Sequence, residues 1–188
     1  MKYVILAIAG IAFLYALSQI YSPPQIELKD LWKYEGKEIV TEGKVINKFG
    51  SMIEIREGNY TAYVYSWHDD FSYGDIIKVR GNVEEKNGNV VIYANEIELL
   101  KKWSKDCISL PYLAENFEDY IDCNVNLTGY VYSSYSDYFY LIDEYNEYRV
   151  KVYYSNSSFD KFQRVNVRGI LKYNSHRMEF YIEGEYVK

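Results

Sequence analysis

The chain has 188 residues, with 21 lysines and arginines against 27 aspartates and glutamates, and a formal net charge of −6. A hydrophobic fraction of 48% with 26% charged residues is typical of a globular protein and excludes a disordered one. The two histidines, His68 and His176, argue against His-based metal sites and Ser-His-Asp hydrolases, because such sites need imidazoles placed together with other reactive groups. The sequence therefore predicts no catalytic residue, no metal and no cofactor, and we expect a protein that is not an enzyme.

The N-terminal stretch is apolar. Residues 3–21 carry no charged side chain, and Pro23-Pro24 ends any helix formed there. A stretch of this length is about the minimum for a hydrocarbon core of ~30 Å, and Lys2 favours a cytoplasmic N-terminus. We expect residues 1–22 to form a single-pass transmembrane helix that binds the membrane through residues 3–21 and leaves the C-terminal domains outside the cell. The alternatives are a cleaved signal peptide, which gives a secreted protein, and a buried core helix.

The next part of the chain, residues 28–100, alternates apolar and polar residues. This pattern predicts β-strands over residues 39–45, 51–56, 61–65, 76–83 and 90–94. Asn87-Gly88 between the last two is a strong hairpin signal.

Cys107 and Cys123 are the only cysteines, and both follow the apolar N-terminal stretch. Because disulfides persist outside the cytoplasm, we expect these two residues to form one. The alternative is a pair of reduced, buried thiols.

Residues 110–187 repeat the plan of residues 28–100, with predicted strands over 125–131, 138–142, 148–153, 165–169 and 178–182. The glycines Gly43 and Gly81 align with Gly129 and Gly169 in the second copy. The ordered series predicts an internal repeat. The second copy departs from the first at Phe162, where Lys161-Phe162-Gln163 replaces the turn-forming Gly74-Asp75.

Two segments carry a resemblance to a known fold: Gly36 to Val45, read as GKEIVTEGKV, and Gly74 to Val83, read as GDIIKVRGNV. They resemble OB-folds of the anticodon-binding and replication-protein type. The resemblance implies an all-β protein with two tandem five-stranded OB-type barrels, over residues 28–100 and 110–187, behind the N-terminal helix. An anchor followed by an OB-fold also resembles the haem chaperones of cytochrome c maturation, but the segments 99–103 and 183–188 lack the histidine of that family.

OB-folds that bind single strands use aromatic side chains on the second and third strands beside a basic groove. The resemblance therefore points to five ligand-binding candidates in the first copy: Tyr63, Tyr65, Trp67, Lys44 and Arg56. Strand alternation places Tyr63 and Tyr65 on the outer face. The alternative is that they only reflect the high tyrosine content, 23 residues in all.

Two clusters hold side chains of the kind that bind metals, namely Trp67-His68-Asp69-Asp70 and residues 143–147. Neighbouring residues rarely all point toward one ion, so we expect a solvated loop at the first and a turn at the second.

Charge argues against nucleic acid as the main ligand. Residues 28–105 hold 12 basic and 13 acidic side chains, and residues 106–188 hold 8 and 13. Neither part has the basic excess that phosphate binding needs. We expect a binding protein that takes an envelope protein or glycan on the Tyr-rich face of the first barrel. The alternatives are a binder of single-stranded nucleic acid, through the first domain, and a structural spacer or assembly component.

Overall fold

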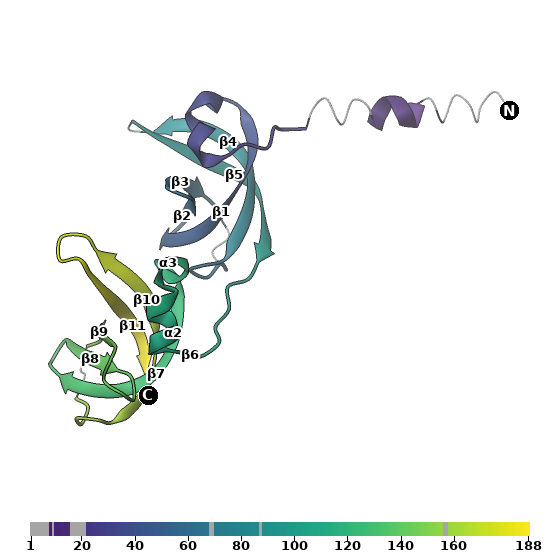
Figure 1. Ribbon diagram of the computed structural model, residues 1–188. Coiled ribbons are helices and arrows are strands. Elements are labelled where there is room, and N and C mark those ends of the chain that lie inside the picture. The colour runs from purple at the N-terminus through teal and green to yellow at the C-terminus, as the bar shows by residue number, and fades with distance from the viewer. Residues whose placement is uncertain (1–7, 9, 16–21, 68–69, 87, 156–157) are drawn as a thin grey trace.

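Two β-barrels follow one another along the chain (Figure 1). The computed structural model describes residues 8, 10–15, 22–67, 70–86, 88–155 and 158–188. The first barrel contains the 3-10 helix η1 (Leu28–Tyr34) and five strands, β1 (Glu38–Phe49), β2 (Met52–Glu57), β3 (Tyr60–Tyr65), β4 (Ile76–Lys86) and β5 (Asn89–Lys101). The second contains β6 (Ile108–Ser109), α2 (Leu110–Glu115), α3 (Phe117–Tyr120), β7 (Asn124–Ser134), β8 (Tyr138–Ile142), β9 (Arg149–Tyr153), β10 (Arg164–Asn174) and β11 (Glu179–Val187).

The two barrels close in the same way. The first has the strand order β1-β2-β3-β5-β4 and closes where β1 pairs with β4. The second repeats this order as β7-β8-β9-β11-β10 and closes where β10 pairs with β7, while β6 adds to β7. In each set of five strands only the third and fifth are parallel neighbours. This topology is that of an OB-fold, so the predicted all-β fold with two tandem five-stranded OB-type barrels is confirmed.

Each barrel is filled by every second side chain of its strands. In β3 the predicted alternation is observed, because Ala62 and Val64 are buried while Tyr63 and Tyr65 point outward. Short helices that the sequence pattern did not predict complete the two cores. Leu28 and Leu31 of η1 enter the first core, and Leu110 and Leu113 of α2 enter the second. An apolar pair from the segment before the first strand thus shields each core from water.

The glycines that align between the copies occupy equivalent positions. Gly43 in β1 and Gly129 in β7 face equivalent residues of β4 and β10. Gly81 and Gly169 each lie at a shift of strand register, where a Cβ atom would collide with a main-chain oxygen of the neighbouring strand. Only glycine allows the two backbones to approach so closely at these bulges. The predicted internal repeat is therefore confirmed strand by strand.

The turn before the fourth strand is also the same in both barrels. Gly74 has a φ angle of +97°, and its N–H donates to the oxygen of Val45 at 2.8 Å. Phe162 takes this place in the second barrel with a φ angle of +64°, and its N–H donates to the oxygen of Val131 at 2.6 Å. The two copies differ in sequence at this turn but share its backbone conformation. Phe162 is therefore held in a conformation that favours glycine.

The N-terminal segment contributes little to the described fold. Residues 8 and 10–15 are helical with exposed side chains. Most of the predicted anchor, residues 3–21, lies outside the described residues, as do His68, Asp69 and Asn87. In the part of the chain that is described, we find no helix with the length and apolar character needed to cross a membrane.

The predicted disulfide is not formed, and both cysteines are free thiols. The parallel pairing of β6 with β7 places Ile108 beside Leu127, and hence Cys107 beside Asn126. Cys123 lies three residues earlier along the chain, a separation of about 10 Å at ~3.3 Å per strand residue. A disulfide needs Cα atoms within about 7 Å, so strand register keeps the two thiols apart.

Replacement of Phe162 by glycine is expected to raise the free energy of unfolding by about 0.5–1 kcal/mol. The left-handed conformation costs about 1–2 kcal/mol for a residue with a side chain, and the greater backbone entropy of glycine offsets part of the gain. Little burial is lost, because Phe162 is 58% exposed. Urea unfolding measures the effect.

The matched variant Gly74→Ala should lose stability, because its Cβ would collide with the Trp103 ring. If Phe162→Gly lowered the free energy of unfolding as much as Gly74→Ala does, the assigned turn would be contradicted.

Alkylation of the native chain near pH ~8 is expected to modify Cys107 and spare Cys123. Cys107 is exposed, whereas burial raises the pKa of the Cys123 thiol to about 11 and shields it from reagent. Mass spectrometry counts the modified thiols, with Cys107→Ser as the control that should stay unmodified until unfolded. Two protected sulfurs in the unfolded, unreduced chain would show a disulfide after all.

Candidate functional site

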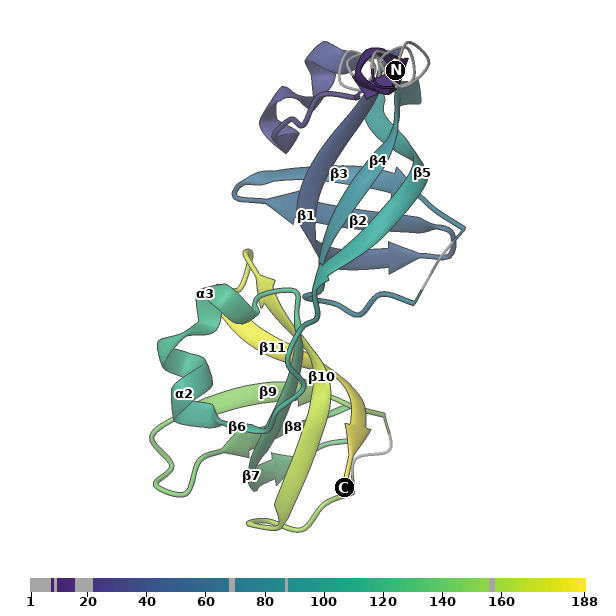
Figure 2. The same cartoon turned by 90° about the vertical axis from the view of Figure 1, so that its right-hand side faces the viewer.

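A junction of polar contacts joins the two barrels, which are stacked end to end (Figure 2). Trp103 of the connecting segment is bound to both. Its main-chain N–H donates to Asp75 Oδ1 at 2.8 Å, and its Nε1 donates to the oxygen of Asn124 at 2.8 Å. Asn124, in turn, donates its main-chain N–H to the oxygen of Tyr73 at 3.4 Å. The connection is therefore held at each end by hydrogen bonds to a barrel.

Arg56, a predicted ligand-binding residue, belongs to this junction. Its Nη1 lies 3.0 Å from Asp122 Oδ2, and its Nη2 donates to the oxygen of Ile121 at 3.1 Å. Lys172 of β10 binds the other oxygen of the same carboxylate, with Nζ 3.1 Å from Asp122 Oδ1. The ion pair crosses from β2 of the first barrel to the start of the second, so the Arg56 guanidinium is already occupied.

Lys44 belongs to the same junction, because it lies opposite Arg56 in the pairing of β1 with β2. Its Nζ donates to the oxygen of Asp119 at 3.1 Å and lies 5.3 Å from the centroid of the Trp103 ring. The structure thus brings Lys44 and Arg56 together, and both are engaged by residues 119–122 of the second barrel. Arg56 still lies on the same outer face of the first barrel as Tyr63 and Tyr65.

Of the two tyrosines predicted in the first barrel, Tyr65 belongs to a small outer cluster. The Tyr65 ring stacks on Tyr93 of β5, with centroids 5.0 Å apart and an angle of 10° between the planes. Lys86 Nζ lies 4.5 Å from the Tyr65 centroid. Tyr63 is half-buried, and Trp67 is 94% exposed in the loop after β3.

A larger aromatic surface lies on the second barrel. We call it the aromatic face, and it consists of Tyr138, Tyr140, Tyr153, Tyr181 and Lys151. Ring centroids are 6.1 Å apart for Tyr138 and Tyr153, 5.8 Å for Tyr138 and Tyr140, and 5.3 Å for Tyr153 and Tyr181. Lys151 Nζ lies 4.2 Å from the Tyr138 centroid and 4.6 Å from the Tyr153 centroid. Four rings from three strands are therefore in contact, and one ammonium group lies beside two of them.

The hydrogen bond of Lys151 with Tyr153 raises the pKa of this lysine and so favours its charged ammonium form. Arg149 adds a second cation at the edge of the face. Its Cζ lies 3.9 Å from the centroid of Tyr132 and 5.9 Å from that of Tyr140. Cations over aromatic rings leave a surface that can stack on flat apolar groups and attract negative charge.

Strand registers show how the two barrels differ on this face. The pairing of β2 with β3 makes Met52 and Glu54 the counterparts of Tyr138 and Tyr140 in the pairing of β8 with β9. Val91 on β5 is likewise the counterpart of Tyr181 on β11. Three of the four tyrosines of the aromatic face therefore have no aromatic counterpart in the first barrel.

The acidic cluster at residues 143–147 is a turn, as predicted. The Asp143 carboxylate accepts the N–H groups of Tyr145, Glu147 and Tyr148 at 3.1, 2.9 and 2.7 Å. Burial acts to raise the pKa of Asp143, but these three donors outweigh it and hold the pKa below the usual range. Within the described residues no group of three or more His, Cys, Asp or Glu side chains is placed to hold a metal ion.

A double-mutant cycle of Arg56→Gln and Asp122→Asn is expected to give a coupling energy of about 1–2 kcal/mol, since the pair is charged, hydrogen-bonded and partly buried. Asparagine keeps the left-handed conformation of Asp122, which has a φ angle of +62°. Urea unfolding at low and high salt gives the energies. Asp137→Asn, which removes an exposed carboxylate outside the junction, is the control. Additive effects of the two junction substitutions would show that the ion pair does not hold the barrels together.

Comparison with known proteins finds similarity to solved structures alone. No family model matches the sequence, and no curated protein is similar to it. Among solved structures, an aspartyl-tRNA synthetase of Leishmania major is 13% identical, with a TM-score of 0.38, over 45% of this chain and 22% of that one. Replication protein A of U. maydis bound to ssDNA is 21% identical, with a TM-score of 0.37, over 50% and 84%. Telomere capping protein Ten1 of Saccharomyces pombe is 12% identical, with a TM-score of 0.37, over 52% and 96%.

Proposed function

We propose that this chain is a membrane-anchored, non-enzymatic OB-fold protein that binds a protein or glycan of the cell envelope through the aromatic face. The observation that carries the proposal is the cluster of four tyrosines on the outer side of the second barrel, with the Lys151 ammonium beside two of the rings. Aromatic side chains give a large contact area at low entropic cost, and their hydroxyl groups supply hydrogen bonds to polar partners.

The location follows from the N-terminal sequence. An apolar stretch over residues 3–21 behind Lys2 supports an anchor with the barrels outside the cell. A partner of the envelope is then the nearest ligand for this half-exposed aromatic face. The low histidine content, with His68 and His176 alone in the sequence, supports binding over catalysis.

The second candidate is binding of single-stranded nucleic acid. The position of the cations favours it, because Lys151 and Arg149 lie over the rings on which bases would stack. The overall charge opposes it, with 8 basic and 13 acidic side chains over residues 106–188. We therefore place it second to a protein or glycan ligand.

Binding of the full chain to an isolated cell-envelope fraction is expected to weaken at least about tenfold in the double variant Tyr138→Ala/Tyr153→Ala. Each stacked aromatic contributes about 1–3 kcal/mol, and 1.4 kcal/mol is about tenfold in affinity. Tyr145→Ala is the matched control, since Tyr145 is 77% exposed and lies outside the aromatic face. Circular dichroism checks that each variant folds.

Oligothymidylate at about 50 and 200 mM salt provides the second arm of this experiment. Tight binding that falls steeply with salt, together with no binding to the envelope fraction, would favour the nucleic-acid function. Equal binding of the wild type and the double variant to both probes would contradict any role for the aromatic face.

A further inference from the structure

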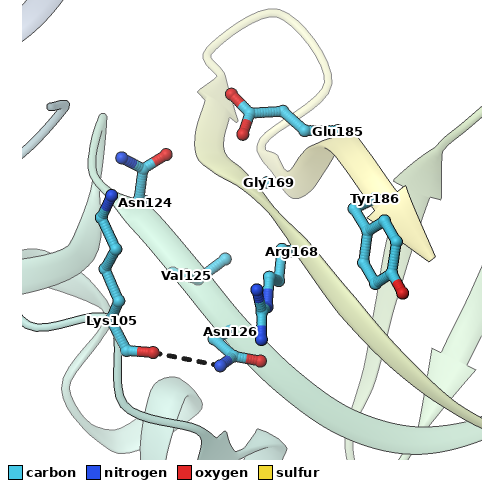
Figure 3. Close-up of a pocket in the computed structure, with 8 residues that line it drawn as sticks. All are labelled: Lys105, Asn124, Val125, Asn126, Arg168, Gly169, Glu185 and Tyr186. Carbon is cyan, nitrogen blue, oxygen red and sulfur yellow. Dashed lines mark hydrogen bonds between the residues drawn. The ribbon is translucent and has the colours of Figure 1, made fainter. Parts of the chain in front are cut away.

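A pocket of about 440 Å³ opens on β7, β10 and the end of β11 in the second barrel (Figure 3). We call it the arginine pocket, and the residues used below are Arg168, Lys105, Asn124, Glu185 and Tyr186. It lies beside the Gly169 bulge and uses none of the residues of the aromatic face. Its test is therefore independent of the proposed function.

The first barrel shows what an arginine does at this position. Arg80 precedes the Gly81 bulge as Arg168 precedes the Gly169 bulge. In the first barrel the guanidinium binds Glu38 through two hydrogen bonds, from Nε to Oε1 at 3.0 Å and from Nη2 to Oε2 at 3.2 Å. This bond holds the pKa of Glu38 below its usual range. The geometry at the bulge thus presents an arginine to a carboxylate held on the first strand.

The second barrel lacks this carboxylate. Register places Asn124 where the first barrel has Glu38, because each precedes the residue that faces the bulge glycine. On the neighbouring strand Tyr186 faces Arg168, whereas Glu96 faces Arg80. Both acidic residues placed next to Arg80 are therefore replaced by uncharged ones next to Arg168.

The Arg168 guanidinium consequently makes no ion pair with any of the described residues. Its nearest aromatic neighbour is the Tyr186 ring, 5.8 Å from Cζ to the centroid. Lys105 of the connecting segment supplies a second cation to the pocket. Figure 3 shows the Glu185 carboxylate at the opposite end of the pocket from the Arg168 guanidinium. An open positive site thus exists in the half of the chain that carries the larger negative charge.

We propose that the arginine pocket binds the carboxylate of an acidic sugar. Arg168 takes the carboxylate through the paired hydrogen bonds that Arg80 makes with Glu38, and Lys105 adds a second positive charge. The Tyr186 ring, 47% exposed, packs against the sugar ring. The pocket volume lies within the range of small-ligand sites, about 300–1,000 Å³.

Titration of the ¹⁵N-labelled full chain with glucuronate, followed by NMR, tests this proposal. We expect saturable shifts of the amides of Gly169 and Asn126, which line the pocket, and no such shifts with neutral glucose. Arg168→Gln should weaken binding at least tenfold. Asn124→Glu should do the same by restoring the internal carboxylate of the first barrel. The matched control is Arg177→Gln, which removes an exposed arginine of the β10–β11 hairpin and should leave the affinity unchanged.

Glucuronate shifts that persist in Arg168→Gln, or equal shifts with glucose, would overturn the proposal. A tetraglutamate peptide forms a further arm. Binding of the peptide that needs Arg168, without binding of glucuronate, would overturn the assignment of a sugar and identify an acidic protein segment as the ligand. Arg168→Gln changes an exposed side chain, so the fold is expected to survive, and its amide spectrum verifies this.

Discussion

The ion pairs of Asp122 hold the two barrels together and determine which of their cations can bind a ligand. This residue adopts a left-handed conformation, donates its N–H to the oxygen of Leu171 at 2.8 Å, and directs its carboxylate to Arg56 and Lys172. One side chain thereby connects β2 of the first barrel to β10 of the second. Because the contact is charged and partly buried, removal of one partner leaves the others unpaired in a poorly solvated place. The cations that hold the barrels together are therefore engaged within the chain and do not bind a ligand.

Comparison of the two copies shows which residue positions barrel closure requires and which positions can vary. Inward side chains and the bulge glycines Gly81 and Gly169 are alike in both copies, because a closed barrel needs them there. Outward positions carry no such requirement, and they differ. In the first barrel Arg56 and Arg80 are engaged by carboxylates of the chain itself. In the second barrel the residues of the aromatic face are half-exposed and Arg168 is exposed, which is why both proposals concern that half of the molecule.

Sequence reasoning recovered the fold well because strand alternation and glycine spacing are local patterns that barrel closure demands. It missed η1 and α2, since helices this short show too little periodicity to be recognised. It grouped Lys44 and Arg56 with Tyr63 and Tyr65 as ligand-binding residues, but it could not show that residues 119–122 of the second barrel engage the two cations. The tyrosine alternation of Tyr138-Phe139-Tyr140 was visible, but only the register with β9 and β11 shows that the rings share one face. The prediction of a disulfide was wrong for the same reason. Strand register, and not distance along the sequence, sets the separation of the two thiols.

The distance between the barrels is the most direct test of this account. Spin labels at Glu84→Cys and His176→Cys, in a chain that also carries Cys107→Ser, would place one probe in each barrel, and pulsed electron resonance would measure their separation. A junction held by Asp122 predicts a single narrow distribution that broadens when Asp122→Asn is added. A distribution that is already broad with Asp122 intact would contradict a fixed junction, and Lys44 and Arg56 would then be free to bind ligand beside the tyrosines of the first barrel.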